Sequence, residues 1–170
     1  FAVSTHATML DQGGPADELV PRIRTAAAAA QQEARFAILA LSSAAGSAPF
    51  DAALRRYVDF LVADGELDVE MEVDPGVTLG PDEEIEVFRI VQEGLTNALK
   101  HARATRADVT VRHLDESLEV EVRDDGAGET TGDGLGQGLV GVRERVKIYG
   151  GEMSCGRAPG GGFVLRARLP

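Results

Sequence analysis

The sequence is short of positive charge, cysteine and long apolar runs, and each shortage excludes a class of protein. Its 170 residues hold 17 Lys and Arg against 28 Asp and Glu, a formal net charge of −11. Nucleic acids and anionic membranes attract clustered cations, so we expect no direct contact with nucleic acid. The single cysteine, Cys155, excludes an internal disulfide and fits a reducing, cytoplasmic compartment. No apolar run is long enough to cross a bilayer.

What is present is a soluble globular balance, 44% hydrophobic and 26% charged. A chain of this length fits one domain, or one domain with an appendage. The chain begins at Phe1 instead of Met, so we expect it to be part of a longer protein. Any membrane-anchoring region of that protein is then expected upstream of residue 1.

The first 46 residues are predicted to form a helical hairpin. Gln12-Gly-Gly-Pro15 breaks a first helix, and a second helix runs from Pro15 to about Ala45. Its near-heptad apolar positions are Leu19, Ile23, Ala27, Ala30, Ala34, Ile38 and Leu41. So long an apolar stripe cannot cover itself, which predicts a homodimer through a four-helix bundle. Gly46-Ser-Ala-Pro49 is the linker, and it sets domains at 1–46 and 47–170.

The second domain mixes helical and alternating patterns. Helices are predicted over 51–63, 81–102 and 138–149, and strands over 67–73, 108–114, 117–123, 152–156 and 163–169. Helices interspersed with strand hairpins indicate an α+β fold, a two-layer sandwich with a mixed sheet and the helices on one face.

The stretch from Phe88 to Ala102 is the most informative segment. Its apolar residues fall at helical spacing: Phe88, Val91, Leu95, Ala98 and Ala102. Glu93 and Asn97, four residues apart, are neighbours on one side of that helix. Lys100 and His101 continue this polar ridge by another turn. Such a ridge beside a buried stripe suits a helix that faces a bound anion and metal.

Three glycine clusters accompany this helix. They are Gly126 and Gly128; Gly134, Gly136, Gly138 and Gly141; and Gly160 to Gly162. Glycine lets the backbone approach a ligand closely, and the second cluster leads into a helix whose N-terminal amides suit phosphate. No Gly-Lys-Ser/Thr follows, which excludes a Walker-type loop. The cluster does not open a βαβ unit, as a dinucleotide fingerprint should.

In order along the chain, the motifs are Glu-x-x-x-Asn, Asp-x-Gly-x-Gly, Gly-x-Gly-Leu-x-Gly and Gly-Gly-Gly. From about Leu54 to Pro170 this order resembles the ATP-binding domain of sensor histidine kinases, a fold shared with gyrase, Hsp90 and MutL. Two segments resemble the subgroup that pairs with response regulators carrying helix-turn-helix DNA-binding output. These segments are Gln92–Ala102 and Gly138–Val146.

The resemblance implies ATP and Mg²⁺ as ligands and a role for each polar residue. Asn97 would give its amide oxygen to Mg²⁺, and Glu93 would be the base that orients or deprotonates the accepting histidine. Lys100 and His101 would neutralise phosphate charge. Asp124 would accept a hydrogen bond from the adenine amino group.

The glycines are implied to shape the rest of the nucleotide site. Gly126 and Gly128 would leave room for the ring, and Glu129 to Gln137 would form the tip of a mobile lid. Its hinge would be Gly136, Gly138 and Gly141, and Leu139, Gly162 and Phe163 complete the expected nucleotide contacts. The family usually has Gly-Thr where this chain has Gly162-Phe163, so apolar packing replaces a hydroxyl there.

The acceptor histidine is the second departure from the family. His6 is followed by Ala7 instead of an acidic residue and lies near a helix end, so we expect the acceptor upstream of Phe1. His113 lies in a strand, where a structural role is the default. The expected activity is histidine kinase, with a response regulator as onward partner. Two alternatives stay open: an anti-sigma-factor-type serine kinase, and a non-catalytic ATP-dependent interaction module.

Overall fold

The computed structural model describes residues 8–9, 15–24, 26–27, 30, 34, 49–63, 65–127 and 137–170, without the side chains of His101 and Gln137. The chain divides into two compact units, Phe1–Leu41 and Ser42–Pro170. In the first unit, the described residues from 16 onward are helical, as predicted. His6, the break at 12–14, Ile38, Leu41 and residues 46–48 of the linker lie outside the described residues. The boundary after residue 46 and the bundle therefore stay predictions.

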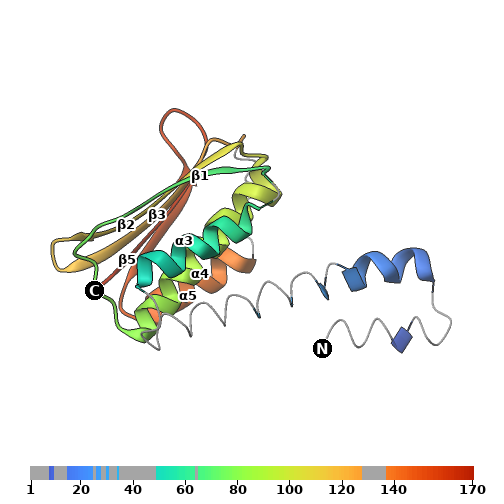
Figure 1. Ribbon diagram of the computed structural model, residues 1–170, viewed down its shortest axis with the longest axis horizontal. Coiled ribbons are helices and arrows are strands. Elements are labelled where there is room, and N and C mark those ends of the chain that lie inside the picture. Colours follow the sequence, from blue (N-terminus) through green and yellow to red (C-terminus); the bar gives the residue numbers. More distant parts are fainter. Residues whose placement is uncertain are drawn as a thin grey trace. The chain divides into compact units, whose positions relative to one another are not determined.

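The second unit is a five-stranded mixed sheet with helices on one face (Figure 1). Its elements in chain order are α3 (Phe50–Leu61), β1 (Asp68–Val73), α4 (Pro81–Asn97), the π-helix η1 (Ala98–Ala102), β2 (Arg106–Leu114), β3 (Ser117–Asp124), α5 (Gln137–Ile148), β4 (Glu152–Arg157) and β5 (Phe163–Leu169). The strand order is β1-β2-β3-β5-β4; β1 and β2 are parallel, and all other neighbours are antiparallel. This confirms the predicted two-layer α+β sandwich.

The helix α4 begins and packs as its sequence predicts. Pro81 occupies the first turn, where a missing N–H costs nothing. The Gly80 N–H donates to Glu83 Oε2 at 2.7 Å, which satisfies one of the free amides at this helix start. The predicted apolar face of α4 and η1 is buried along its whole length: Phe88, Val91, Leu95, Ala98 and Ala102. No helix in the described part of the chain is long and apolar enough to span a membrane.

The core lies between α3, α4 and α5 and one face of the sheet. Alternate residues of the central strands are almost fully buried there: Ala107, Val109, Val111, Leu118, Val120, Val122, Leu165, Ala167 and Leu169. Phe88 packs edge-on against both Phe50 and Tyr57, with ring centroids 5.7 and 5.8 Å apart. Each large apolar side chain buried in this way contributes about 1.5–3 kcal/mol of transfer free energy.

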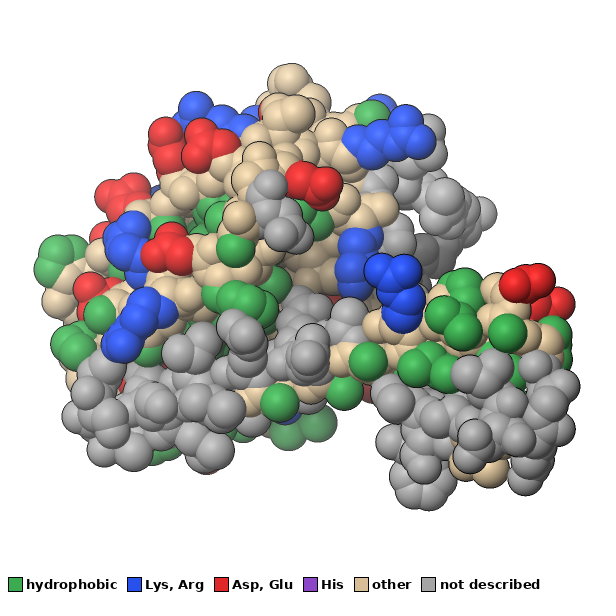
Figure 2. Space-filling view, turned by 45° about the vertical axis from the view of Figure 1, so that its right-hand side comes forward, with side chains coloured by type: hydrophobic (Ala, Val, Ile, Leu, Met, Phe, Trp, Pro, Cys, Tyr) green, Lys and Arg blue, Asp and Glu red, His purple; other side chains and the backbone are tan. Residues whose placement is uncertain are grey.

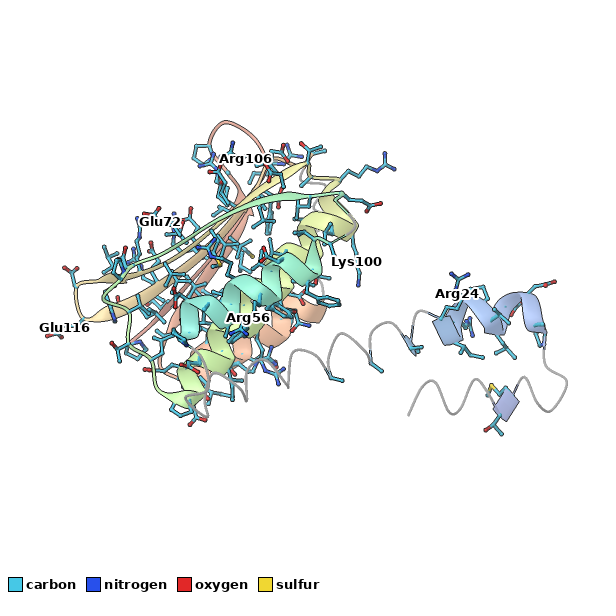
Figure 3. The ribbon with its side chains drawn as sticks, viewed as in Figure 1. Arg24, Arg56, Glu72, Lys100, Arg106 and Glu116 are labelled. Atoms are coloured by element: carbon cyan, nitrogen blue, oxygen red, sulfur yellow. The ribbon has the colours of Figure 1, made fainter. Side chains whose placement is uncertain are left out.

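The other face of the sheet carries charge. Glu72 and Arg106 project from this side, away from the helices (Figure 3). Arg166 pairs here with Glu121, and Arg106 with Glu70. Acidic and basic side chains alternate over the visible surface of this unit instead of forming patches of one sign (Figure 2).

Several predicted boundaries differ from the structure, and two of the differences bear on the candidate site. The predicted helix to Ala102 is α-helical only to Asn97 and ends in the wider π-turn η1. The Ala98 carbonyl accepts hydrogen bonds from Arg103 and Ala104, and Arg103 takes a left-handed conformation with φ 48° that ends the helix. Lys100 and His101 therefore do not continue an α-helical ridge. The second strand begins at Arg106 instead of Asp108. The sequence did not predict this earlier start, because Arg106 is as polar as a loop residue.

Candidate functional site

Glu93 and Asn97 meet on α4, as their spacing predicts. The Asn97 Nδ2 atom donates to Glu93 Oε1 at 3.3 Å, and both side chains are partly buried. In this orientation the side-chain oxygen of Asn97, Oδ1, takes no part in the hydrogen bond to Glu93. A hard oxygen ligand beside a carboxylate fits Mg²⁺, which takes few protein ligands and keeps waters and phosphates for the rest. No group of three or more His, Cys, Asp or Glu in the described residues forms an all-protein metal site.

Gly138, at the start of α5, lies against the Glu93 carboxylate. A Cβ atom at Gly138 would overlap that carboxylate unless the Glu93 side chain moved aside, so the lack of a side chain at Gly138 permits the close approach. On the core side of α4, Gly94 allows the helix to pack closely on β3, since a Cβ there would lie 2.7 Å from the Val122 Cβ. At Gly141, by contrast, a Cβ would make only an ordinary contact, 3.7 Å from Arg145 Nη1. The roles of Gly138 and Gly141 as hinges stay predictions.

Asp124 ends β3 as a buried carboxylate with backbone partners. It is 6% exposed, and its Oδ1 accepts the Gly126 N–H at 2.8 Å. Burial raises the pKa of the Asp124 carboxyl, against hydrogen bonds from the Gly126 and Phe163 amides that lower it. Within the described part of the chain, neither Lys nor Arg forms an ion pair with it.

The neighbouring carboxylate, Asp125, accepts hydrogen bonds from the residues at the start of β2. Its Oδ1 accepts the Thr105 and Arg106 N–H groups at 2.8 and 2.9 Å, and its Oδ2 accepts the Thr105 hydroxyl at 2.7 Å. The Arg106 and Thr105 hydrogen bonds lower the pKa of Asp125. Asp125 is therefore an anchor between the end of β3 and the start of β2. The sequence did not reveal it, since nothing near Thr105 marks that partner.

The loop after Asp124 packs directly on the end of η1. The Ala127 N–H donates to the Ala102 carbonyl at 3.0 Å, and a Cβ at Gly126 would overlap Ala102. Gly162, with φ 81°, approaches the Asp124 carbonyl so closely that a Cβ there would overlap it. The end of η1 at Ala102, Gly126 of the first glycine cluster and Gly162 of the last one are thus brought together around Asp124. A hollow of about 220 Å³ adjoins the same loop, lined by Arg106, Asp108, Arg123, Asp124, Asp125, Gly160 and Gly161.

The remaining predicted site residues lie in different parts of the unit, and some of them are not described. Lys100 is exposed and projects from η1 away from the sheet (Figure 3). Leu139 is 8% exposed and belongs to the core, while Phe163 is half-buried and faces Asp124 across the β3–β5 pair. The His101 side chain, Gly128, Gly136 and the predicted lid tip up to residue 136 lie outside the described residues.

A contact that sequence reasoning missed joins α5 to α4. Arg145 Nε lies 3.4 Å from Glu86 Oε2, and the Glu86 side chain is only 7% exposed. The two residues are far apart in the sequence, and each falls within an ordinary charged helix pattern. Only the packing of the two helices brings them together.

Comparison with known proteins gives a consistent result. Residues 82–170 match the family described as histidine kinase-, DNA gyrase B- and HSP90-like ATPase. An uncharacterised sensor-like histidine kinase of Chloroflexus aurantiacus is 34% identical over 129 residues, 69% of this chain and 21% of that protein. The oxygen sensor histidine kinase NreB of Staphylococcus carnosus is 35% identical over 94 residues, 52% of this chain and 27% of that one.

Solved structures agree with the fold. The histidine kinase domain of the blue-light activated histidine kinase EL346 of Erythrobacter litoralis has a TM-score of 0.62 and 27% identity, covering 72% of this chain and 61% of that chain. The Acinetobacter baumannii histidine kinase AdeS covers 98% of this chain with a TM-score of 0.61, but at 11% identity it supports the fold alone. The chain spans only 21% and 27% of the two curated relatives named above.

Proposed function

Because the chain belongs to the histidine kinase-, DNA gyrase B- and HSP90-like ATPase family, we propose that it binds Mg·ATP as the catalytic part of a sensor histidine kinase. The observation that carries this proposal is Asp124. A carboxylate that is buried without a cation keeps acceptor capacity for a ligand. The adenine amino group is such a ligand, and the Glu93–Asn97 pair on α4 supplies the oxygen atoms expected near the phosphates.

The proposed reaction transfers the γ-phosphate to a histidine. Asn97 would hold Mg²⁺ through its carbonyl oxygen, and the metal when bound neutralises phosphate charge. Glu93 orients the accepting imidazole or takes its proton while a ring nitrogen attacks the γ-phosphorus and ADP departs. Lys100 offers further positive charge at the end of η1.

We extend the proposal to partners. The helical segment 1–46 pairs with a second copy in a four-helix bundle, and phosphate passes onward to a response regulator with helix-turn-helix output. Sedimentation of 1–170 beside 47–170 tests the first part. A dimer for the longer chain and a nucleotide-binding monomer for the shorter one are expected; two monomers would contradict the bundle.

Calorimetric titration with Mg·ADP and Mg·ATP tests the site. Asn97→Ala should lose the part of the affinity that depends on Mg²⁺. Glu93→Gln should bind nucleotide normally but transfer phosphate slowly, in a chain extended upstream to include the acceptor. Glu72→Gln, an exposed carboxylate on the opposite face of the sheet, is the matched control (Figure 3). No binding heat in the wild-type protein would refute the function, and unchanged transfer in Glu93→Gln would refute the base.

A further inference from the structure

The helix α5 is held on α4 at two levels. Near its start, Gly138 lies against Glu93; two turns later, Arg145 lies against Glu86. Gly138 and Arg145 are seven residues apart, as are Glu86 and Glu93, and the two pairs run in opposite directions. Both contacts therefore fall on one antiparallel seam, two helical turns long.

The Arg145–Glu86 contact is the stronger of the two anchors. Glu86 Oε2 and Arg145 Nε are both buried, and within the described residues neither atom forms a hydrogen bond. Their ion pair, 3.4 Å long, is thus the compensation for a buried carboxylate. Removing the guanidinium takes away the cationic partner of the buried Glu86 carboxylate, so α5 would have to move away to admit water.

The Gly138–Glu93 contact is sensitive to such a movement. The missing side chain at Gly138 allows the two to approach, and a displacement of α5 opens space beside the carboxylate. Glu93 could then turn away from the Asn97 amide, its other neighbour. A misplacement of about 1 Å at a reacting group lowers rates by up to about 100-fold.

We propose that Arg145 is a positioning residue: through Glu86 it fixes α5 on α4, and the first turn of α5 in turn fixes the orientation of the Glu93 carboxylate. The part that concerns the rate rests on the proposed function. The docking part does not, because it is a property of the protein without nucleotide.

Amide hydrogen exchange of the 170-residue chain tests the docking. Arg145→Gln should speed exchange in residues 138–142 by about tenfold and leave β3 and β5 unchanged, since only a local contact is lost. Lys147→Gln removes a charge of the same sign from an exposed position two residues along the same helix and should change nothing. Arg145→Lys keeps the charge and should restore most of the protection.

Phosphoryl transfer, measured in a chain extended upstream to include the acceptor histidine, tests the link to Glu93. Arg145→Gln should lower the transfer rate by about tenfold and change the Mg·ADP affinity by less than about twofold. In a Glu93→Gln background the same change should cost nothing further, because its effect runs through that carboxylate. A purely structural role would instead cost the same factor in both backgrounds.

The outcomes separate the two proposals. Unchanged exchange in Arg145→Gln, or faster exchange spread evenly over α5, β3 and β5, would overturn the inference. Equal rate losses with and without Glu93 would overturn it as well. A wild-type protein that binds no nucleotide would refute the proposed function, and the exchange pattern would still decide the docking.

Discussion

Strand β3 carries two buried carboxylates on opposite faces of the sheet, and their environments contrast. Glu119, 1% exposed, faces the charged side, where Arg112 donates to Oε1 at 2.6 and 3.0 Å and Arg168 donates to Oε2 at 2.9 Å. Burial alone would raise the pKa of Glu119, but these arginines outweigh it and lower the pKa. Asp124, on the helix side, has only backbone amides as partners among the described residues, and burial raises its pKa.

Under the proposed function, the contrast separates a structural carboxylate, Glu119, from a binding one, Asp124. The arginines on either side of Glu119 engage both of its oxygens, which leaves it little acceptor capacity for a ligand. Burial raises the pKa of Asp124, so a charged carboxylate at this position costs stability, which folding alone does not explain. An adenine amino group would supply the missing donor.

The largest loss of stability is expected at Gly162, where backbone packs directly against the backbone of Asp124. Gly162→Ala places a Cβ onto the Asp124 carbonyl at a residue with φ 81°. We expect a loss of at least about 3 kcal/mol in the free energy of unfolding, from overlap and left-handed strain together. Urea unfolding measures it.

Gly161→Ala is the matched control, because Gly161 also has a positive φ of 104° but open space around it. It should lose only about 1–2 kcal/mol, from the strain alone. Equal losses for the two variants would mean that the close approach to Asp124 is unimportant.

The second effect concerns ligand affinity. Asp124→Asn should weaken Mg·ADP binding by about 10- to 100-fold, because a hydrogen bond to a charged acceptor contributes about 1.5–3 kcal/mol. Stability at neutral pH should not fall, since an amide oxygen still accepts from Gly126 and no buried charge remains. Glu119→Gln should leave the affinity unchanged. Calorimetry measures the affinity of both variants, and thermal unfolding measures their stability. Loss of affinity in Glu119→Gln would contradict the different roles assigned to the two carboxylates.

The sequence could predict one side of this comparison and not the other. Asp124 stood out through the glycines that follow it, and Phe88, Val91 and Leu95 through helical periodicity. Glu119 looked like an ordinary outward residue of an alternating strand. Its burial depends on Arg112 and Arg168, which come from two other strands. The wider turn of η1 was also invisible, because apolar spacing alone does not separate α- from π-helical hydrogen bonding.

The third effect removes the arginine partners. Arg112→Gln with Arg168→Gln removes both hydrogen-bonding arginines from the Glu119 carboxylate. Among the described residues this leaves Arg166, whose Nε lies 3.8 Å from Glu119 Oε2 and which also pairs with Glu121. We expect a loss of about 2 kcal/mol, less than for a deeply buried pair because both arginines are half-exposed and water can replace them. Nucleotide affinity should stay the same. A loss that disappears when Glu119→Gln is added identifies the carboxylate as its cause.

The smallest effect is in the pH dependence of stability, where the two carboxylates act with opposite sign. Glu119 has a lowered folded pKa, so its contribution is present above about pH 4 and is lost as pH falls through the folded pKa. Asp124 has a raised folded pKa, so stability falls as pH rises from about 4 through the folded value. Relative to the wild-type protein, Asp124→Asn should thus become more stable, and Glu119→Gln less stable, between pH 4 and pH 7. Urea unfolding across this range checks the two slopes; slopes of the same sign would contradict the assignment.

The place of β5 in the sheet has a consequence for biosynthesis. β5 comes after β4 in the chain but lies between β3 and β4, and Phe163 pairs with Asp124. A ribosome makes the chain from its N-terminal end, so Asp124 waits without that neighbour, and β4 without a strand to join, until residues 163–169 have emerged. We expect nascent chains stalled before Phe163 to retain no ADP and to be cut readily by protease. Chains released beyond Leu169 should gain ADP binding and protease resistance in one step.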